Sequence, residues 1–329
     1  MINIEKVTVD KLSLYRGKPV KINDSISMCI PTIGDISDYG EEKYYSMIYN
    51  LCSVGIDLCW QLEEVGIKFD EISDYELFVN ILCKNYNTDQ TKIIFGDKLN
   101  FQKMKTCFNT ENKSIVLCQT YLISIPLKKS PSLKSDTIVQ IPVNSNVVLH
   151  NKYSNEFYEI QYGQFTGYII SDYLYKKDNN YFIYDPEVFD YRYGSVEYGT
   201  ILIDEYDYYK IVSYLRAMHN LKRDDRIAGT NSCRMAFIED AKMEYEEKKN
   251  EPFKSNLLPM ISTLVNMDGF KRNDSDIWDM NIYAFMDSVK RISKIRNSTL
   301  LLQSGYSGFG IDLSKIKNKN ELDFMGELN

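Results

Sequence analysis

Apolar and polar residues alternate at the start of the chain and then change to a helical period. Residues 7–33 alternate around two turn-forming stretches, Arg16–Pro19 and Asn23–Asp24, which predicts two short strands joined by a turn. From Asp35 the apolar positions recur at the spacing of helices that bury one face. The stripes that predict three successive helices are Tyr44, Ile48 and Leu51; Leu58, Leu62 and Val65; and Tyr75, Phe78 and Leu82. Residues 1–118 are therefore expected to form a hairpin followed by a small helical bundle.

Short β-type runs, separated by Ser, Asn and Gly, fill the middle of the chain. They are Thr137–Ile141, Asn146–His150, Phe157–Gln161 and Thr166–Ile170. Strands of this length and spacing are typical of a small barrel, which we place at residues 123–176. The two ends of a compact domain commonly lie close together, so we expect the barrel to be an insertion in one helical domain that both flanks build.

Helical periodicity returns after an acidic, tyrosine-rich return segment at residues 177–204. The apolar stripe that predicts the next helix contains Tyr208, Ile211, Leu215 and Met218, and further helices are expected over residues 233–249, 256–265 and 276–304. The apolar face of the last helix contains Ile282, Phe285, Val289 and Ile292. The predicted fold class is α+β: a mainly helical domain with an N-terminal β-hairpin, interrupted by an inserted β-barrel and completed by residues 205–329.

The order of motifs in the inserted segment carries a family resemblance. Lys128–Ser135 has the composition of an opening loop, Phe157–Ile160 is a short aromatic strand, and Gly167–Leu174 is a closing glycine, aromatic and aliphatic motif. In this order the motifs resemble the bacterial SH3 (SH3b) domain family over residues 123–175. The resemblance implies an SH3-like barrel, and it implies that the barrel recognises peptidoglycan peptides, as many family members do.

The chain departs from the SH3b pattern at the residues that matter most for ligand binding. Phe157 and Tyr168 stand where the family has paired tryptophans, and Lys128 or Lys129 stands where it usually has an arginine. The resemblance implies that Phe157 and Tyr168 belong to the barrel core. We therefore expect these two side chains to be structural.

The flanking helical parts carry a second resemblance. The segments Leu12–Pro19, Pro31–Ile36, Tyr39–Tyr45 and Trp278–Ile292 resemble uncharacterised proteins of bacteriophages that infect Gram-positive hosts. They are also distantly similar to tail-assembly and baseplate-assembly proteins of such phages. The resemblance implies a role in virion assembly, although these motifs define no chemistry.

Composition and charge narrow the classes of function. The chain has 329 residues and a formal net charge of −7, which argues against a general nucleic-acid coat because phosphate binding uses clustered Lys and Arg. No apolar run is long enough to cross a bilayer, and Met1–Lys6 lacks the order of a signal peptide. We expect the protein in the cytoplasm of the bacterial host cell, with the virion as a second location. The seven scattered cysteines are expected to be reduced thiols.

Candidate catalytic groups are sparse. The two histidines, His150 and His219, fall in different predicted domains, and we interpret them as a strand-edge and a helix-surface residue. Gly305–Gly310 follows a predicted helix, so it is expected to be a helix end and turn and not a phosphate loop. The carboxylates of residues 239–247 alternate with lysines, as on a solvated helix face. The sequence therefore predicts no enzyme, no cofactor and no metal site.

Aromatic residues beside charges are the candidates for contacts with other proteins. Tyrosine is enriched at interfaces, and the acidic return segment is either such an interface or a pair of strands that leads back to the helical domain. The predicted helix 276–304 has apolar residues on a second face, and the tail at residues 313–325 is either a docked helix or a partner-binding arm. The candidate interaction residues are Tyr181, Tyr184, Tyr191, Tyr193, Trp278, Met286, Tyr306 and Phe324.

Together these observations predict a non-enzymatic bacteriophage structural or morphogenesis protein. It would be a tail or baseplate component or an assembly chaperone, and it would contact other phage proteins or further copies of itself as a homo-oligomer. Neither a membrane nor a specific nucleic acid is expected as a partner. The alternative is a cell-wall protein that binds peptidoglycan peptides through the SH3b-like segment.

Overall fold

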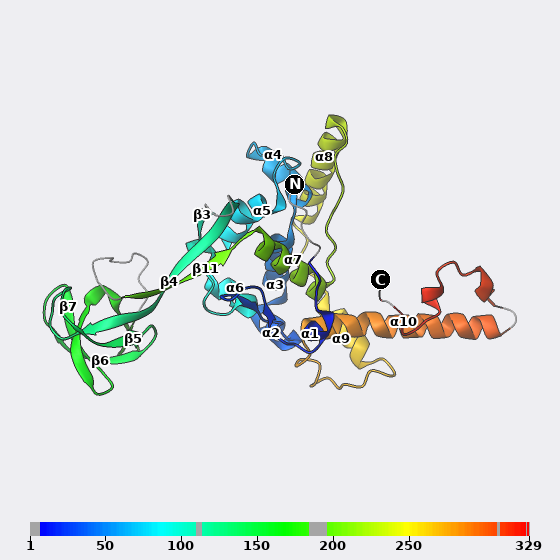
Figure 1. Cartoon of the computed structure of the whole chain (residues 1–329). Coiled ribbons are helices and arrows are strands. Elements are labelled where there is room, and N and C mark those ends of the chain that lie inside the picture. Colours follow the sequence, from blue (N-terminus) through cyan, green and yellow to red (C-terminus); the bar gives the residue numbers. More distant parts are fainter. Residues whose placement is uncertain (1–6, 110–113, 184–195, 308–309, 327, 329) are drawn as a thin grey trace. The chain divides into compact units, whose positions relative to one another are not determined.

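The computed structural model divides the chain into two compact units (Figure 1). Unit 1 combines residues 1–116 and 203–329, and unit 2 contains residues 117–202. The structure describes residues 7–109, 114–183, 196–307, 310–326 and 328. Unit 1 therefore draws on both flanks of the chain, whereas the finer boundaries at residues 123–176 and 177–204 stay predictions.

Unit 1 is mainly helical. Its helices are α1 (Lys11–Tyr15), α2 (Ile33–Tyr39), α3 (Glu41–Cys52), α4 (Cys59–Glu64), α5 (Asp74–Leu77), α6 (Thr88–Phe95), α7 (Glu205–His219), α8 (Asn231–Lys248), α9 (Leu257–Val265) and α10 (Ile282–Tyr306). Short 3₁₀ or π turns are η1 (Gly55–Leu58), η2 (Phe78–Leu82), η3 (Cys83–Asn85), η4 (Phe101–Lys103), η6 (Leu313–Lys315) and η7 (Lys319–Glu321). With the sheet described below, they confirm the predicted mixture of helices and strands.

The N-terminal hairpin is shorter than the alternation predicts. Strands β1 (Val20–Lys21) and β2 (Ser27–Met28) pair antiparallel, but the residues before them form α1 and no strand. The side chain of Asp10 accepts hydrogen bonds from the amides of Leu12 and Ser13, both at 3.1 Å. This cap satisfies amides at the start of a helix and explains the local switch from strand to helix.

The core of unit 1 forms where α3 and α7 pack together. The stripe Tyr44, Ile48 and Leu51 on α3 is buried, and so is the stripe Tyr208, Ile211, Leu215 and Met218 on α7, which confirms both predicted faces. Arg216 Nη2 also donates a hydrogen bond to the carbonyl of Cys52 at 2.6 Å. On each of the two helices, residues spaced by three or four positions therefore form one face, and that face is buried in the core.

His219, the last residue of α7, lies inside this core. Its Nδ1 is 2.7 Å from the carbonyl oxygen of Leu215, and its Nε2 is 2.7 Å from the Tyr44 hydroxyl. Because a carbonyl can only accept, Nδ1 carries the proton and Nε2 accepts from the phenol. Burial lowers the pKa of His219 to about 4. The interpretation of His219 as a helix-surface residue is therefore wrong, because this face of α7 meets α3.

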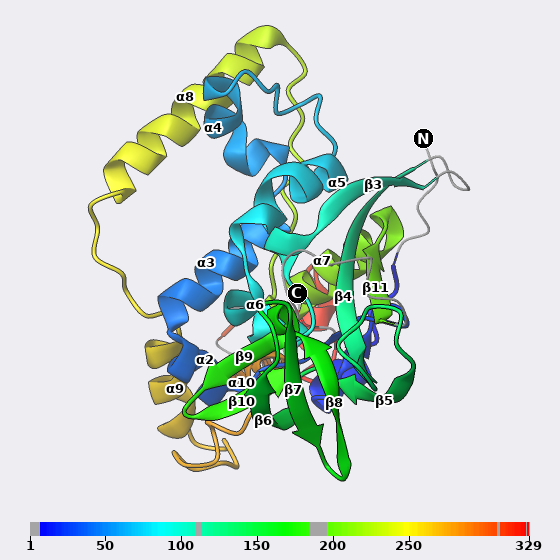
Figure 2. The same cartoon turned by 90° about the vertical axis from the view of Figure 1, so that its left-hand side faces the viewer.

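Helices α4 and α8 lie side by side (Figure 2). Phe237, Ile238 and Ala241 of α8 pack against a small cluster that includes Cys59 and Leu62 of α4. The remaining surface of α8 is solvated, with ion pairs that join Glu244 to Lys248 and Glu246 to Lys249. The prediction of a solvated charged face on this helix is confirmed.

The start of α10 is attached to the N-terminal part of the chain. The amides of Ile33 and Gly34 donate to the carbonyls of Met280 and Trp278, and the amide of Ile282 donates to that of Pro31, all at 2.9 Å. Asn281 caps the helix by accepting from the amide of Ala284 at 2.9 Å. The helix therefore begins at Ile282 and not at residue 276, because residues 278–282 are committed to these backbone contacts.

Unit 2 is built on an antiparallel sheet that is not closed. The strands of this sheet are β4 (Ser114–Lys128), β5 (Thr137–Pro142), β6 (Asn146–Lys152), β7 (Phe157–Tyr162), β8 (Phe165–Ile170), β9 (Leu174–Lys177), β10 (Asn180–Ile183) and β11 (Glu197–Ile203), with η5 (Ser171–Tyr173) before β9. The strand β3 (Lys105–Asn109), which belongs to unit 1, pairs with β4. The pairing path is β11-β4-β8-β7-β6-β10-β9, with β5 also paired to β4. The four predicted runs are confirmed as β5 to β8. The strands of this sheet nevertheless start at Lys105, in a part of the chain that was expected to be helical.

The stability of the fold is predicted to depend on pH through His219. Below pH 6.5 the unfolded chain takes up a proton at this histidine, whereas the folded chain does so only near its pKa of about 4. The free energy of unfolding therefore decreases by about 3 kcal/mol in total as the pH falls from 6.5 towards 4. Urea unfolding between pH 4 and 7 measures this loss.

A matched pair of variants isolates the effect of this histidine. His219→Gln removes the titrating group and should flatten the pH dependence in that window, whereas His150→Gln, at an exposed position of β6, should leave it unchanged. An unaltered pH slope in His219→Gln would show that the buried imidazole does not govern acid stability.

Candidate interaction surface on helices α9 and α10

Most of α10 extends beyond the core that holds its first turn. Ile282, Ala284 and Phe285 are buried, and beyond them only Ser298 is buried within this helix of 25 residues. Val289 and Ile292 are half-buried, so the predicted apolar face is fully buried in the first turn and partly buried further along. At 1.5 Å per residue α10 is about 38 Å long, longer than the core that could cover it.

Helix α9 is fixed at its N-terminus by a residue far away in the sequence. The carboxylate of Glu41, at the start of α3, accepts hydrogen bonds from the amides of Asn256 and Leu257 at 2.8 and 3.0 Å. It also accepts from the hydroxyl of Ser255 at 2.5 Å. A negative charge at a helix N-terminus satisfies unpaired amides and complements the helix dipole. This cap determines where α9 begins and fixes its end to α3.

A groove with a volume of about 510 Å³ lies between α9 and α10. Its apolar lining consists of Met260, Leu264 and Met267 on one side and Val289 and Ile292 on the other. The rest of its lining is small and polar, apart from Pro259, with Arg296 as the charged member. Among the described residues Arg296 makes no ion pair. The groove therefore combines an apolar floor with a positive rim. We call it the α9–α10 groove.

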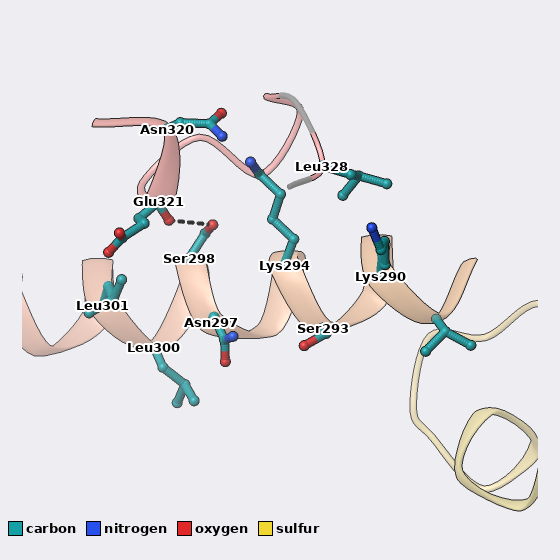
Figure 3. A pocket seen from close by; sticks show the side chains of 11 residues that line it. Lys290, Ser293, Lys294, Asn297, Ser298, Leu300, Leu301, Asn320, Glu321 and Leu328 are labelled. Carbon is teal, nitrogen blue, oxygen red and sulfur yellow. Dashed lines mark hydrogen bonds between the residues drawn. The ribbon is translucent and has the colours of Figure 1, made fainter. Parts of the chain in front are cut away.

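A second cavity, of about 660 Å³, lies between α10 and the C-terminal segment 310–328 (Figure 3). Lys290 and Lys294 point towards that segment, whereas Leu300 points away from it. Ser298 Oγ donates to the carbonyl of Glu321 at 2.7 Å, the contact drawn as a dashed line in Figure 3. Lys290 also donates to Asn220 Oδ1 at 2.5 Å, and its pKa is lowered by loss of hydration and then by nearby Lys222.

The C-terminal segment is held on α10 mainly by hydrogen bonds from side chains of α10 to backbone carbonyls of the segment. Arg291 Nη1 donates to the carbonyls of Phe324 and Gly326 at 3.0 and 2.9 Å. The apolar side chains of the segment are buried to different extents: Leu313, Ile316 and Leu322 are half-buried, whereas Met325 stays 76% exposed. Of the two alternatives for the tail, it is docked here, but as short turns and not as a long helix.

The candidate interaction residues fall into two groups. Trp278 lies just before α10, Met286 is half-buried on it, and Tyr306 is 82% exposed at its end. Phe324, half-exposed in the C-terminal segment, lies over the same helix. Tyr181 belongs to unit 2, where Lys176 lies over its ring at 5.8 Å. Tyr184, Tyr191 and Tyr193 lie outside the described residues.

The two expected core residues of the inserted segment differ in burial. Phe157 is buried in the cluster that also contains Ile160 and Ile169, whereas Tyr168 packs against the edge of that cluster and is half-buried. The Tyr168 ring also meets Tyr153 edge to face, with ring centroids 5.6 Å apart. Phe157 is therefore a buried core residue, whereas Tyr168 is only partly buried.

Several residues of the surface were not found from the sequence. Glu41, Met260, Met267 and Arg296 belong to it, although the sequence analysis assigns none of them a role in binding. The available signal was the stretch Leu257–Val265, which is strongly apolar and contains no charged residue that would mark one face as solvent-exposed.

The described residues offer no other obvious chemistry at this surface. They contain no group of three or more His, Cys, Asp or Glu side chains arranged to hold a metal ion. Within the part of the chain that the structure describes, no helix is both long and apolar enough to span a membrane. What α9 and α10 present is therefore apolar and basic surface, which suits binding.

Comparison with known proteins points to the same region. Residues 247–326 match the family model of the YomV second domain, from a family of Bacillus phage-like proteins. The matched segment contains α9, α10 and most of the C-terminal segment. Neither a curated protein nor a solved structure matches the chain. The SH3b resemblance of residues 123–175 stays a prediction.

The cap on α9 makes a local prediction. Glu41→Gln removes the charge that accepts from Asn256 and Leu257, and should weaken the start of α9 by about 1 kcal/mol. Hydrogen exchange of amides in α9 should then speed up. Glu42→Gln is the control, because it removes a neighbouring carboxylate from the same turn of α3 without touching α9. Equal exchange in the two variants would contradict the proposed anchoring role of Glu41.

Proposed function

We propose that this chain is a non-enzymatic bacteriophage structural or morphogenesis protein that acts through protein–protein contacts. The observation that carries the proposal is a coincidence of position. The segment that matches a phage-like family, residues 247–326, is also the segment whose long helix leaves the core and exposes apolar side chains. We call residues 247–326 the C-terminal module.

The exposed surface of the C-terminal module supports a binding role. Large apolar side chains with 40% or more of their surface exposed are Phe253, Leu258, Trp278, Ile295, Leu300, Tyr306, Ile311, Phe324 and Met325. Scattered apolar residues are normal on a protein surface, but a series along one helix and the segment beside it is typical of an interaction site. As a tail or baseplate component, or as a chaperone for their assembly, this protein would bury the surface against its partner.

The alternative function, binding of peptidoglycan peptides by unit 2, rests on a different observation. Tyr153 is 61% exposed and lies edge to face with Tyr168, a position that the SH3b resemblance assigns to a family tryptophan. Next to Tyr153, Lys152 of β6 lies over the ring of Tyr158, its partner on β7, at 5.3 Å. Exposed tyrosines beside a lysine are suited to peptide contacts.

The experiment that tests the proposal uses a phage or prophage that carries this gene. Mass spectrometry of purified particles and of assembly intermediates should find the protein in at least one of them. A nonsense codon in the gene should abolish infectious particles, and a wild-type copy should restore them. Normal yields of infectious particles from the nonsense mutant would refute an essential assembly role.

The same preparation separates the alternative. Sedimentation of the purified protein with peptidoglycan should leave it in the supernatant if the assembly role is correct. Co-sedimentation that is lost in Tyr153→Ala, together with normal particle yields from the nonsense mutant, would instead establish wall binding.

A further inference from the structure

The apolar positions of α10 that face α9 continue as a stripe beyond the α9–α10 groove. Val289, Ile292 and Arg296 line the groove, and Leu300 follows four residues later. Positions with spacings of three and four residues lie on one side of a helix. Leu300 is 55% exposed and points away from the C-terminal segment. The stripe is therefore exposed in part, because Val289 and Leu300 also line the cavity beside the C-terminal segment.

The lining of the groove favours an apolar helix over an extended peptide. Two of its apolar side chains, Met260 and Met267, are flexible thioethers that adapt to differently shaped neighbours. Anchors at i, i+3, i+4 and i+7 of a docked helix fit such a floor. No unpaired sheet edge takes part in this surface, since both walls of the groove are helices or the residues next to them.

The charge at the rim selects the sign of the partner. Arg296 is the charged residue in the lining of the groove. The other basic residues of α10 do not line the groove: Lys290 and Lys294 point towards the C-terminal segment, and Arg291 donates to its backbone. The sign of the rim is therefore set by Arg296. A docked helix with carboxylates beside its apolar face would meet this positive rim, whereas a basic helix would be repelled.

From these observations we propose that the α9–α10 groove is the docking site for an acidic amphipathic helix of a partner protein. The proposal rests on the proposed function and specifies its partner. The apolar face of the partner helix packs on Met260, Val289 and Ile292, and its carboxylates lie beside Arg296. The interaction therefore weakens as the salt concentration rises, because the charges at the rim are exposed to solvent.

The test uses the full-length protein and two labelled peptides of equal length, one an amphipathic Leu/Glu helix and the other its Leu/Lys counterpart. Fluorescence anisotropy should show binding of the Leu/Glu peptide and much weaker binding of the Leu/Lys peptide. Arg296→Glu should weaken Leu/Glu binding by roughly tenfold and strengthen Leu/Lys binding. Thr299→Glu is the control, because it places the same carboxylate at an exposed position of α10 outside the groove.

A gain of affinity provides a second, independent readout. Thr263→Lys adds a positive charge to the rim on α9 and should tighten Leu/Glu binding, whereas Ser262→Lys, exposed but outside the lining, should not. Thermal melts of all four variants check that each is folded. Equal binding of the two peptides, or equal effects of a groove variant and its control, would overturn the proposal.

Two further outcomes assign the groove differently. If the wild-type protein is a dimer by light scattering and Arg296→Glu makes it a monomer, a second copy occupies the groove and the acidic partner helix is rejected. If neither peptide binds while the protein is still found in phage particles, the proposed function stands and the docking site is wrong. If the Leu/Glu peptide binds but the protein is dispensable for particle formation, the docking site stands and the proposed function is wrong.

Discussion

Three backbone hydrogen bonds between residues 31–34 and residues 278–282 fix the start of α10. They consume the amides and carbonyls that would otherwise extend the helix backwards, so the helix begins at Ile282 with Asn281 as its cap. Its first turn is buried in the core, and its direction is set there. The rest of α10 then has few neighbours of its own domain, and its half-buried positions become the walls of the two cavities. The candidate surface is thus a consequence of where the helix is attached.

Local patterns predicted the elements of this fold better than their contacts. The runs that became β5 to β8 and the stripes of α3 and α7 were readable, because alternation and helical spacing depend on neighbouring residues. His219 was misplaced because its burial depends on Tyr44, which is distant in the sequence. Val65 was expected in a helical stripe but is exposed, since α4 ends one residue earlier.

The candidate site shows the same division. Tyr306 and Phe324 were identified from composition, and both lie exposed on or over α10. The predicted apolar face includes Val289 and Ile292, which are only half-buried, because a helical period says which residues share a side and not how far the core extends along it. Glu41 could not be associated with α9 from the sequence, because a side chain that caps a helix from another element leaves no local signal.

The distribution of charge gives α10 a distinct role within an acidic protein. The chain carries a formal net charge of −7, yet the charged residue that lines the α9–α10 groove is Arg296. Net negative charge discourages association between copies, while a local positive rim attracts carboxylates over about a Debye length. Apolar burial in the groove would then supply most of the affinity, and the rim would decide which helices are admitted.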